Sequence, residues 1–152
     1  MISLLLASLI LGAGDPGPVT LELLPSKAEA LASMPKVEIK VESDGKTVTY
    51  SGVPLASILD GRDKPTPGMA GLRNLSDAVI LVRGADGYQA AVSAAAVAMD
   101  PKGERYLLAT SRDGQTRPGQ LIIPGDPKHA RWVRDVVAIR LVRLDQVVKP
   151  GP

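Results

Sequence analysis

One short segment near the C-terminal end of the sequence holds most of the side chains that could do chemistry. His129 is the only histidine, and it stands in a basic cluster with Lys128, Arg131 and Arg134, with Trp132 between the cations. Cationic groups beside an aromatic face can hold an anionic or planar ligand. In a structural interpretation, Trp132 instead anchors the final strand to the core, which is the commoner role for a loop whose path proline and glycine fix.

Two further residues lie next to predicted turns and join the candidate site. Tyr88 follows an Asp86-Gly87 turn, and Arg112 precedes Gly114 in a second turn. Arg112 could reach an anion, although a surface arginine usually only faces water. Tyr88 could equally be an aromatic residue that stabilises a pair of strands. No catalytic residue is predicted, and the predicted ligand-binding residues are Tyr88, Arg112, His129, Arg131 and Trp132.

The side chains that the sequence lacks exclude several kinds of chemistry. Without cysteine there is no disulfide, no thiolate metal ligand and no thiol nucleophile. With one histidine and no cysteine, a metal site such as a zinc site is not expected. The serines lack a nucleophile-elbow sequence, so hydrolase chemistry has no support. A nucleic acid is not an expected partner, because there is no recognition-helix pattern and no dense run of lysine and arginine.

Length and composition indicate a folded domain with a real core. The chain has 152 residues, of which 45% are hydrophobic and 22% charged, so it is too apolar to be disordered. Its 13 Pro and 15 Gly favour short strands joined by many turns. Residues 1–100 carry 8 basic and 11 acidic side chains, whereas residues 101–152 carry 10 and 5. Such a basic excess can mark an anion-binding face, but it is also typical of an ordinary solvated surface.

The N-terminal segment predicts export. Residues 2–11 are almost entirely apolar, small residues follow, and the first charged side chain is Asp15. The apolar run is shorter than the roughly 18 residues that span a bilayer, and the small residues suit cleavage before Asp15. We therefore predict a signal peptide over 1–14, a single domain over 15–152, and a periplasmic or secreted location. The alternatives are a packed strand or an uncleaved segment that tethers the chain to a membrane, because no lysine or arginine precedes the run.

Periodicity and turn chemistry predict mainly strands, with short helices between them. Residues 37–42 and 47–51 alternate apolar and polar side chains around Asp44-Gly45, which predicts a hairpin because Asp-Gly tolerates positive φ. Ser93 is the predicted N-cap of a helix that ends at Met99. Residues 78–82 are apolar on both faces, as in a central strand buried on two sides. The remaining predictions are strands over 19–24, 88–92, 106–110, 120–123 and 136–144, helices over 27–33 and from 55 to a stop at Gly61, and a long loop or partly helical excursion over 62–77.

Five motifs occur in an order and at spacings that resemble those of a known family. They are Ser51-Gly52-Val53-Pro54-Leu55 with Ile58-Leu59, Ala85-Asp86-Gly87-Tyr88, Arg112-Asp113-Gly114, Pro124-Gly125-Asp126 and Ala130-Arg131-Trp132-Val133. Over roughly residues 19–144, this set resembles the oxidoreductase molybdopterin-binding domain of the sulfite oxidase type. The resemblance implies an α+β fold, mixed and mainly β sheet with short helices, in which the hairpin before Tyr88 lies close to the cofactor side.

The same resemblance sets an expectation about function. Enzymes of that family hold molybdenum by the dithiolene of a pterin and one cysteine thiolate, a soft ligand suited to a metal that cycles by two electrons. This chain has no cysteine to supply that ligand. We therefore predict an exported, non-catalytic binding or accessory module that uses no cofactor. Its expected partners are an anionic or planar small ligand and a redox protein.

Two other hypotheses stay open at this point. In the first, the chain is a molybdenum-cofactor-dependent oxidoreductase with a non-cysteine ligand, and its basic C-terminal residues contact the phosphate of molybdopterin. In the second, it is a structural interaction protein that docks through its basic face. A fold alone does not establish which of these functions a chain performs.

Overall fold

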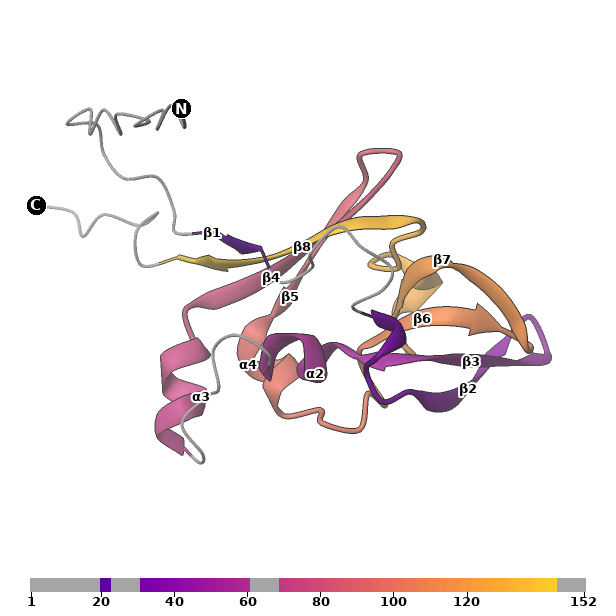
Figure 1. Cartoon of the computed structure of the whole chain (residues 1–152), viewed down its shortest axis with the longest axis horizontal. Coiled ribbons are helices and arrows are strands. Elements are labelled where there is room, and N and C mark those ends of the chain that lie inside the picture. Colours follow the sequence, from indigo (N-terminus) through magenta and orange to yellow (C-terminus); the bar gives the residue numbers. More distant parts are fainter. Residues whose placement is uncertain (1–19, 23–30, 61–68, 145–152) are drawn as a thin grey trace, which may run out of the picture.

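The computed structural model describes residues 20–22, 31–60 and 69–144, which form two antiparallel sheets and several short helices (Figure 1). The first sheet contains β1 Thr20–Glu22, β4 Ala78–Gly84, β5 Gln89–Ser93 and β8 Val136–Arg143, in the spatial order β1-β8-β4-β5. The second sheet contains β2 Val37–Ser43, β3 Lys46–Pro54, β6 Leu107–Arg112 and β7 Gln115–Ile122, in the order β2-β3-β6-β7.

Short helices pack on one side of the first sheet and close the main core. They are α2 Leu55–Asp60, α3 Met69–Leu75 and α4 Ala94–Ala98, and a 3₁₀ turn, η1 Pro127–His129, lies in the loop before β8. The core joins β4 and β8 to α2 and α4 through Ile80, Val82 and Ile139, each 0% exposed. The prediction of an α+β fold that is mainly β sheet with short helices is therefore confirmed.

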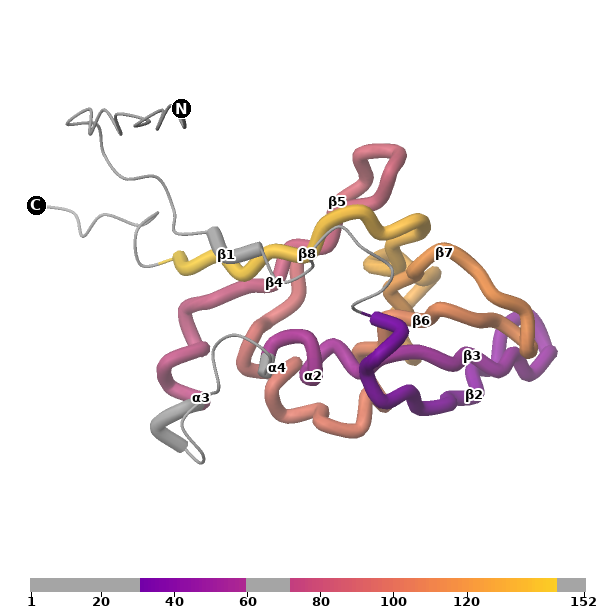
Figure 2. The backbone as a smooth tube through the Cα atoms, viewed as in Figure 1, coloured from indigo at the N-terminus to yellow at the C-terminus, as the bar shows by residue number. Residues whose placement is uncertain are grey.

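Asp-Gly turns close both hairpins of the second sheet. Asp44 and Gly45 have φ values of 50° and 73°, and Asp113 and Gly114 have φ values of 48° and 79°. Two-residue turns with positive φ at both positions match the twist of antiparallel strands, which is why this dipeptide was expected here. The turns lie at the same end of the sheet (Figure 2), where the Asp113 carboxylate accepts a hydrogen bond of 2.9 Å from the Thr49 N–H.

An extra residue bends the second sheet in its middle. The pairing of β3 with β6 shifts between Ser51 and Gly52, because Thr110 is inserted in β6. A Cβ at Gly52 would lie 2.1 Å from the carbonyl oxygen of Leu108, so only glycine permits the close approach of these strands. The bulge increases the local twist and redirects the side chains that follow it.

The predicted helix cap at Ser93 is confirmed. The Ser93 hydroxyl accepts a hydrogen bond of 3.2 Å from the Ala96 N–H, and Met99 is the C-cap of α4. The chain then turns through residues 100–106 around the buried Asp100 carboxylate, which accepts backbone N–H groups of Glu104, Arg105 and Tyr106 at 2.9–3.0 Å.

The expectation that β4 is buried on two sides is wrong. The strand is central, between β8 and β5, but Ile80 and Val82 are 0% exposed whereas Val79 and Leu81 are only half-buried. The physical reason is that the helices cover one face of the first sheet, so the outward residues keep contact with water. Apolar side chains on both faces of β4 therefore do not mean that both faces of the strand are buried.

Several predicted segments lie wholly or partly outside the described residues. The signal peptide over 1–14 is one of them, and of the predicted helix over 27–33 only Leu31 to Ser33 are described. The expected excursion over 62–77 is partly helical, since α3 occupies its second half. In the ranges that the structure covers, no helix has both the length and the apolar character needed to cross a membrane.

Candidate functional site

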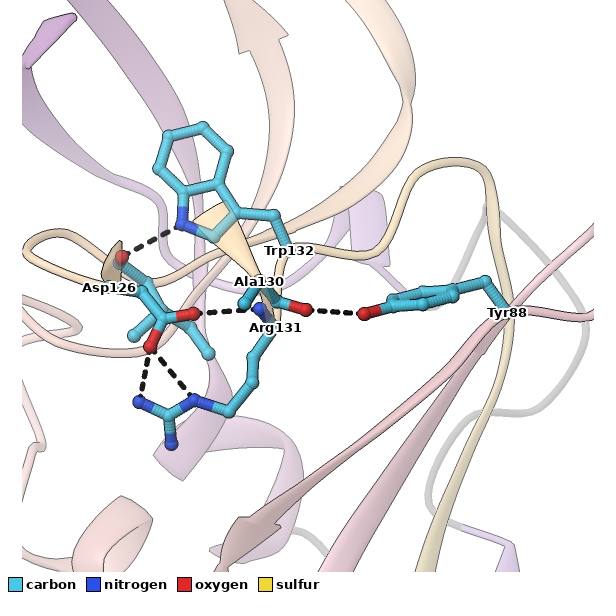
Figure 3. Close-up of polar contacts among 6 residues, drawn as sticks. Tyr88, Asp126, Ala130, Arg131 and Trp132 are labelled. Carbon is cyan, nitrogen blue, oxygen red and sulfur yellow. Dashed lines mark hydrogen bonds and ion pairs between the residues drawn. The ribbon is translucent and has the colours of Figure 1, made fainter. Parts of the chain in front are cut away.

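The loop between β7 and β8 is held by a carboxylate-guanidinium pair. Asp126 Oδ1 accepts hydrogen bonds from Arg131 Nε at 2.9 Å and Nη2 at 2.6 Å, and Oδ2 accepts the Arg131 backbone N–H at 2.7 Å (Figure 3). The Asp126 side chain is 4% exposed and that of Arg131 46%. Hydrogen bonds from Arg131 lower the pKa of the Asp126 carboxyl against the opposing effect of its burial. The same hydrogen bonds raise the pKa of Arg131.

Trp132 anchors this loop, as its structural interpretation expected. The indole N–H donates a hydrogen bond of 2.8 Å to the Ile123 carbonyl, and the ring meets that of Tyr50 edge to face at 5.8 Å between centroids. Trp132 also packs against both clusters of buried apolar residues. The His129 ring stacks on the indole, with 3.7 Å between centroids and 12° between planes. Trp132 is therefore both an anchor and the support for His129.

The backbone under His129 is strained. Lys128 and His129 have φ values of 52° and 53°, a left-handed conformation that costs L-residues roughly 1–2 kcal/mol each. The hydrogen bonds of the turn hold it there, because the His129 N–H donates to the Asp126 carbonyl at 3.1 Å and the Trp132 N–H to the His129 carbonyl at 3.0 Å. Backbone strain of this kind is often found at functional sites, and here it accompanies the stacking of the His129 ring on Trp132.

Beside this stack lies an open groove of about 430 Å³, which we call the basic groove. Three exposed arginines face it, Arg112 from β6, Arg117 from β7 and Arg134 from the loop before β8. None of the three guanidinium groups makes a hydrogen bond or ion pair with another described residue. Asp135 supplies the only carboxylate among the described lining residues. The full lining is Ser43, Tyr50, Arg112, Arg117, Pro118, Gln120, His129, Trp132, Arg134 and Asp135.

The register of the second sheet explains why these arginines meet. Arg112 pairs with Tyr50 on β3, directly before the Asp113-Gly114 turn. The turn brings Arg117 back along the neighbouring strand. Arg134 comes from the loop before β8. This loop is held to the β4–β5 turn by a hydrogen bond of 2.9 Å from the Ala85 N–H to the carbonyl of Asp135, the residue after Arg134. Residues far apart in the sequence therefore surround one hollow.

The structure brings together three of the five predicted site residues. Arg112, His129 and Trp132 line the basic groove. Arg131 is held by Asp126 and does not line it. Tyr88 is 49% exposed, and its hydroxyl donates a hydrogen bond to the Ala130 carbonyl instead of facing the groove (Figure 3).

Sequence reasoning missed several lining residues. Arg134 was part of the basic cluster but not among the predicted ligand-binding residues, and Arg117 was not considered at all. A signal for Arg117 did exist, because a residue shortly after the Asp113-Gly114 turn must return beside the strand that precedes it. Tyr50, Ser43 and Gln120 gave no such signal.

The chemistry of the groove is that of anion recognition. Guanidinium groups present fixed N–H donors that match carboxylate, phosphate and sulfate oxygens. In the described part of the chain, no group of three or more His, Cys, Asp or Glu side chains could hold a metal ion. The arrangement is thus suited to holding a negative group beside an aromatic ring.

Comparison with known proteins adds no family to this picture. No protein-family model matches the sequence, and no curated protein matches it significantly.

Proposed function

We propose that this chain is a non-catalytic binding or accessory module that takes an anionic ligand in the basic groove. The observation that carries the proposal is the meeting of Arg112, Arg117 and Arg134, whose side chains have no partner among the described residues, around a hollow whose described lining holds one carboxylate. Like charges repel, so folding gains little from this arrangement and a bound anion would relieve it. We further propose that the chain is an exported relative of the sulfite oxidase-type domain, on the motifs and the mainly-β fold described above.

The size and walls of the groove support a small organic anion. Ligand pockets commonly measure about 300–1,000 Å³, and this groove falls within that range at about 430 Å³. A charged group would meet the guanidinium N–H donors, and an adjoining ring or apolar face would lie along the stacked rings of His129 and Trp132. The Asp126–Arg131 pair keeps this wall in place without using a groove arginine.

The residues present do not fit a molybdenum ion held in the manner of the sulfite oxidase type. That metal needs a soft thiolate, and the groove offers guanidinium, imidazole, indole, phenol, hydroxyl, amide and carboxylate groups. The chain has no cysteine that could supply such a thiolate. The residues of the groove therefore favour a binding role over the oxidoreductase hypothesis.

Calorimetric titration with citrate tests the proposal. Citrate carries three carboxylates in a small volume, and its affinity should fall with added salt because exposed charges are screened. We expect the triple variant Arg112→Ala, Arg117→Ala, Arg134→Ala to weaken binding by up to about 150-fold, since each exposed ion contact is worth up to about 1 kcal/mol.

The matched control is Arg73→Ala, which removes another exposed arginine, from α3, at the opposite end of the molecule from β7 (Figure 1). Both variants should unfold at the wild-type temperature, because surface substitutions of this kind usually change stability by less than about 0.5 kcal/mol. Equal citrate affinity in the wild type, the triple variant and the control would disprove the assignment of the groove.

A further inference from the structure

A second groove of about 480 Å³ shares Arg117 and Pro118 with the basic groove, and the rest of its lining is different. It carries four hydroxyl side chains, and Lys36 adds a cation to the shared Arg117. Of the described residues that line it, none is acidic. We call it the hydroxyl groove, and its lining is Leu31, Ala32, Lys36, Ser51, Thr110, Ser111, Thr116, Arg117, Pro118 and Gly119.

The two grooves lie on opposite faces of the second sheet and meet over its edge. Successive residues of a strand point to opposite faces, so Tyr50 and Ser51 on β3 serve different grooves. The edge strand β7 joins them, because Arg117 and Pro118 line both. A ligand that passed over β7 at this point would contact both grooves and the same arginine.

The joining point is a second irregularity in the sheet. The pairing of β6 with β7 shifts between Ala109 and Ser111. Opposite the single residue Thr110, β7 carries Arg117, Pro118 and Gly119. A bulge and a proline on an edge strand interrupt the row of backbone N–H and C=O groups that an added peptide strand would need. Recognition at this edge must therefore use side chains.

We infer that the anion bound here is a linear acidic polysaccharide, such as a polyuronate, which lies across Arg117 and occupies both grooves. The inference rests on the proposed function and specifies its ligand. Guanidinium groups of the basic groove match the carboxylates of successive sugars. Hydroxyl side chains donate and accept hydrogen bonds, as sugar hydroxyls do, and the hydroxyl groove gathers Ser51, Thr110, Ser111 and Thr116. The apolar face of one sugar ring would pack beside His129 and Trp132.

Chain length is the property that tests this inference. We would titrate the protein with galacturonic acid and with its linear hexamer. A ligand that reaches both grooves gains from linked contacts, so the hexamer should bind about fiftyfold more tightly, well beyond the statistical gain from its six units. The double variant Lys36→Ala, Ser111→Ala should weaken hexamer binding about tenfold and leave citrate binding unchanged. Lys102→Ala, which removes an exposed lysine outside both grooves, is the matched control.

The outcomes separate this inference from the proposed function. If citrate binds but the hexamer gains only its statistical factor, the polysaccharide is excluded while the anion-binding role stands. If hexaglutamate binds as tightly as the hexauronate, the groove recognises an acidic peptide and the inference is overturned. If neither citrate nor the hexamer binds, the proposed function itself fails. Unchanged unfolding temperatures of the double variant and the Lys102→Ala control exclude misfolding as the cause of lost binding.

Discussion

Arg131 and Arg134 lie on one loop and have opposite surroundings. Arg131 donates three hydrogen bonds to the Asp126 carboxylate, which is almost fully buried. Arg134 faces the basic groove and has no such partner among the described residues. The difference shows that the local density of positive charge does not identify a binding site, because a cation that is already paired has little to offer a ligand. In the proposed site, the unpaired arginines would contact the ligand, and the paired one holds the wall of the groove that they line.

This contrast predicts that the two parts of the site can be broken separately. Substitutions in the Trp132–Asp126–Arg131 group should lower stability first and affect binding as a consequence. Substitutions of Arg112, Arg117 and Arg134 should lower binding and leave stability almost unchanged.

Trp132→Ala should have the largest effect, a loss of about 3 kcal/mol in the free energy of unfolding. The value is at the low end for a core tryptophan because this side chain is only half-buried. Urea unfolding measures it. Trp132→Phe keeps a ring beside Tyr50 but loses the hydrogen bond to Ile123, so its cost should be about 1 kcal/mol. Equal stability of both variants and the wild type would show that Trp132 is no anchor.

Asp126→Asn should cost about 2 kcal/mol, since it removes the charge that three Arg131 hydrogen bonds share. The loss stays below that of a fully buried pair because Arg131 is 46% exposed. Asp126→Asn should cost little further stability in an Arg131→Ala background, a coupling that a double-mutant cycle measures. Fully additive losses would contradict the pairing.

The acid response should report the same carboxylate. Hydrogen bonding depresses the pKa of Asp126 in the folded state from its ordinary value of 3.8, so its stabilisation is fully present above that pH. The stabilisation is lost as the pH falls through the depressed folded-state pKa. The stability difference between wild type and Asp126→Asn should therefore shrink below about pH 4. A difference that stays constant down to pH 2 would mean that the carboxylate is not responsible.

Arg134→Ala should have the smallest effect on folding, less than about 0.5 kcal/mol. It should nevertheless weaken citrate binding about fivefold. Arg131→Ala should instead lower the free energy of unfolding, and any loss of citrate affinity should follow only from the loss of the Asp126–Arg131 contacts that hold the loop. Measuring unfolding and binding on the same two variants compares the paired and unpaired arginines directly. The reverse pattern, with Arg134 needed for stability and Arg131 for binding, would overturn the comparison.

The fold was largely predictable because its signals are local. Asp-Gly turns, the alternation around Asp44-Gly45 and the cap at Ser93 each act within a few residues, and all three appear as expected. The burial of β4 was not predictable in the same way, since it depends on which face the helices cover. Two-sided apolar character in a sequence does not say where the neighbouring elements lie.

The site was only partly predictable because side-chain pairing depends on the folded path of the loops, even between residues close in sequence such as Asp126 and Arg131. His129, Trp132 and Arg112 were identified from residue type and nearby turns, and they do line one groove. The sequence could not show that a buried Asp126 would engage Arg131, or that the bulge opposite Thr110 would bring Arg117 to both grooves. Tyr88 illustrates the same limit, since its hydroxyl is taken by a backbone carbonyl across the loop.

The most direct test of the central claim is a two-dimensional NMR titration of the protein with sulfate at low ionic strength. We expect saturable shifts in the Trp132 indole N–H and in the backbone amides of Arg112, Arg117, His129 and Arg134, while the amide of Arg73 stays unchanged. Such a pattern would place the anion in the basic groove. Small shifts spread evenly over the basic residues, including Arg73, would contradict a specific anion site in the basic groove and indicate only nonspecific electrostatic attraction.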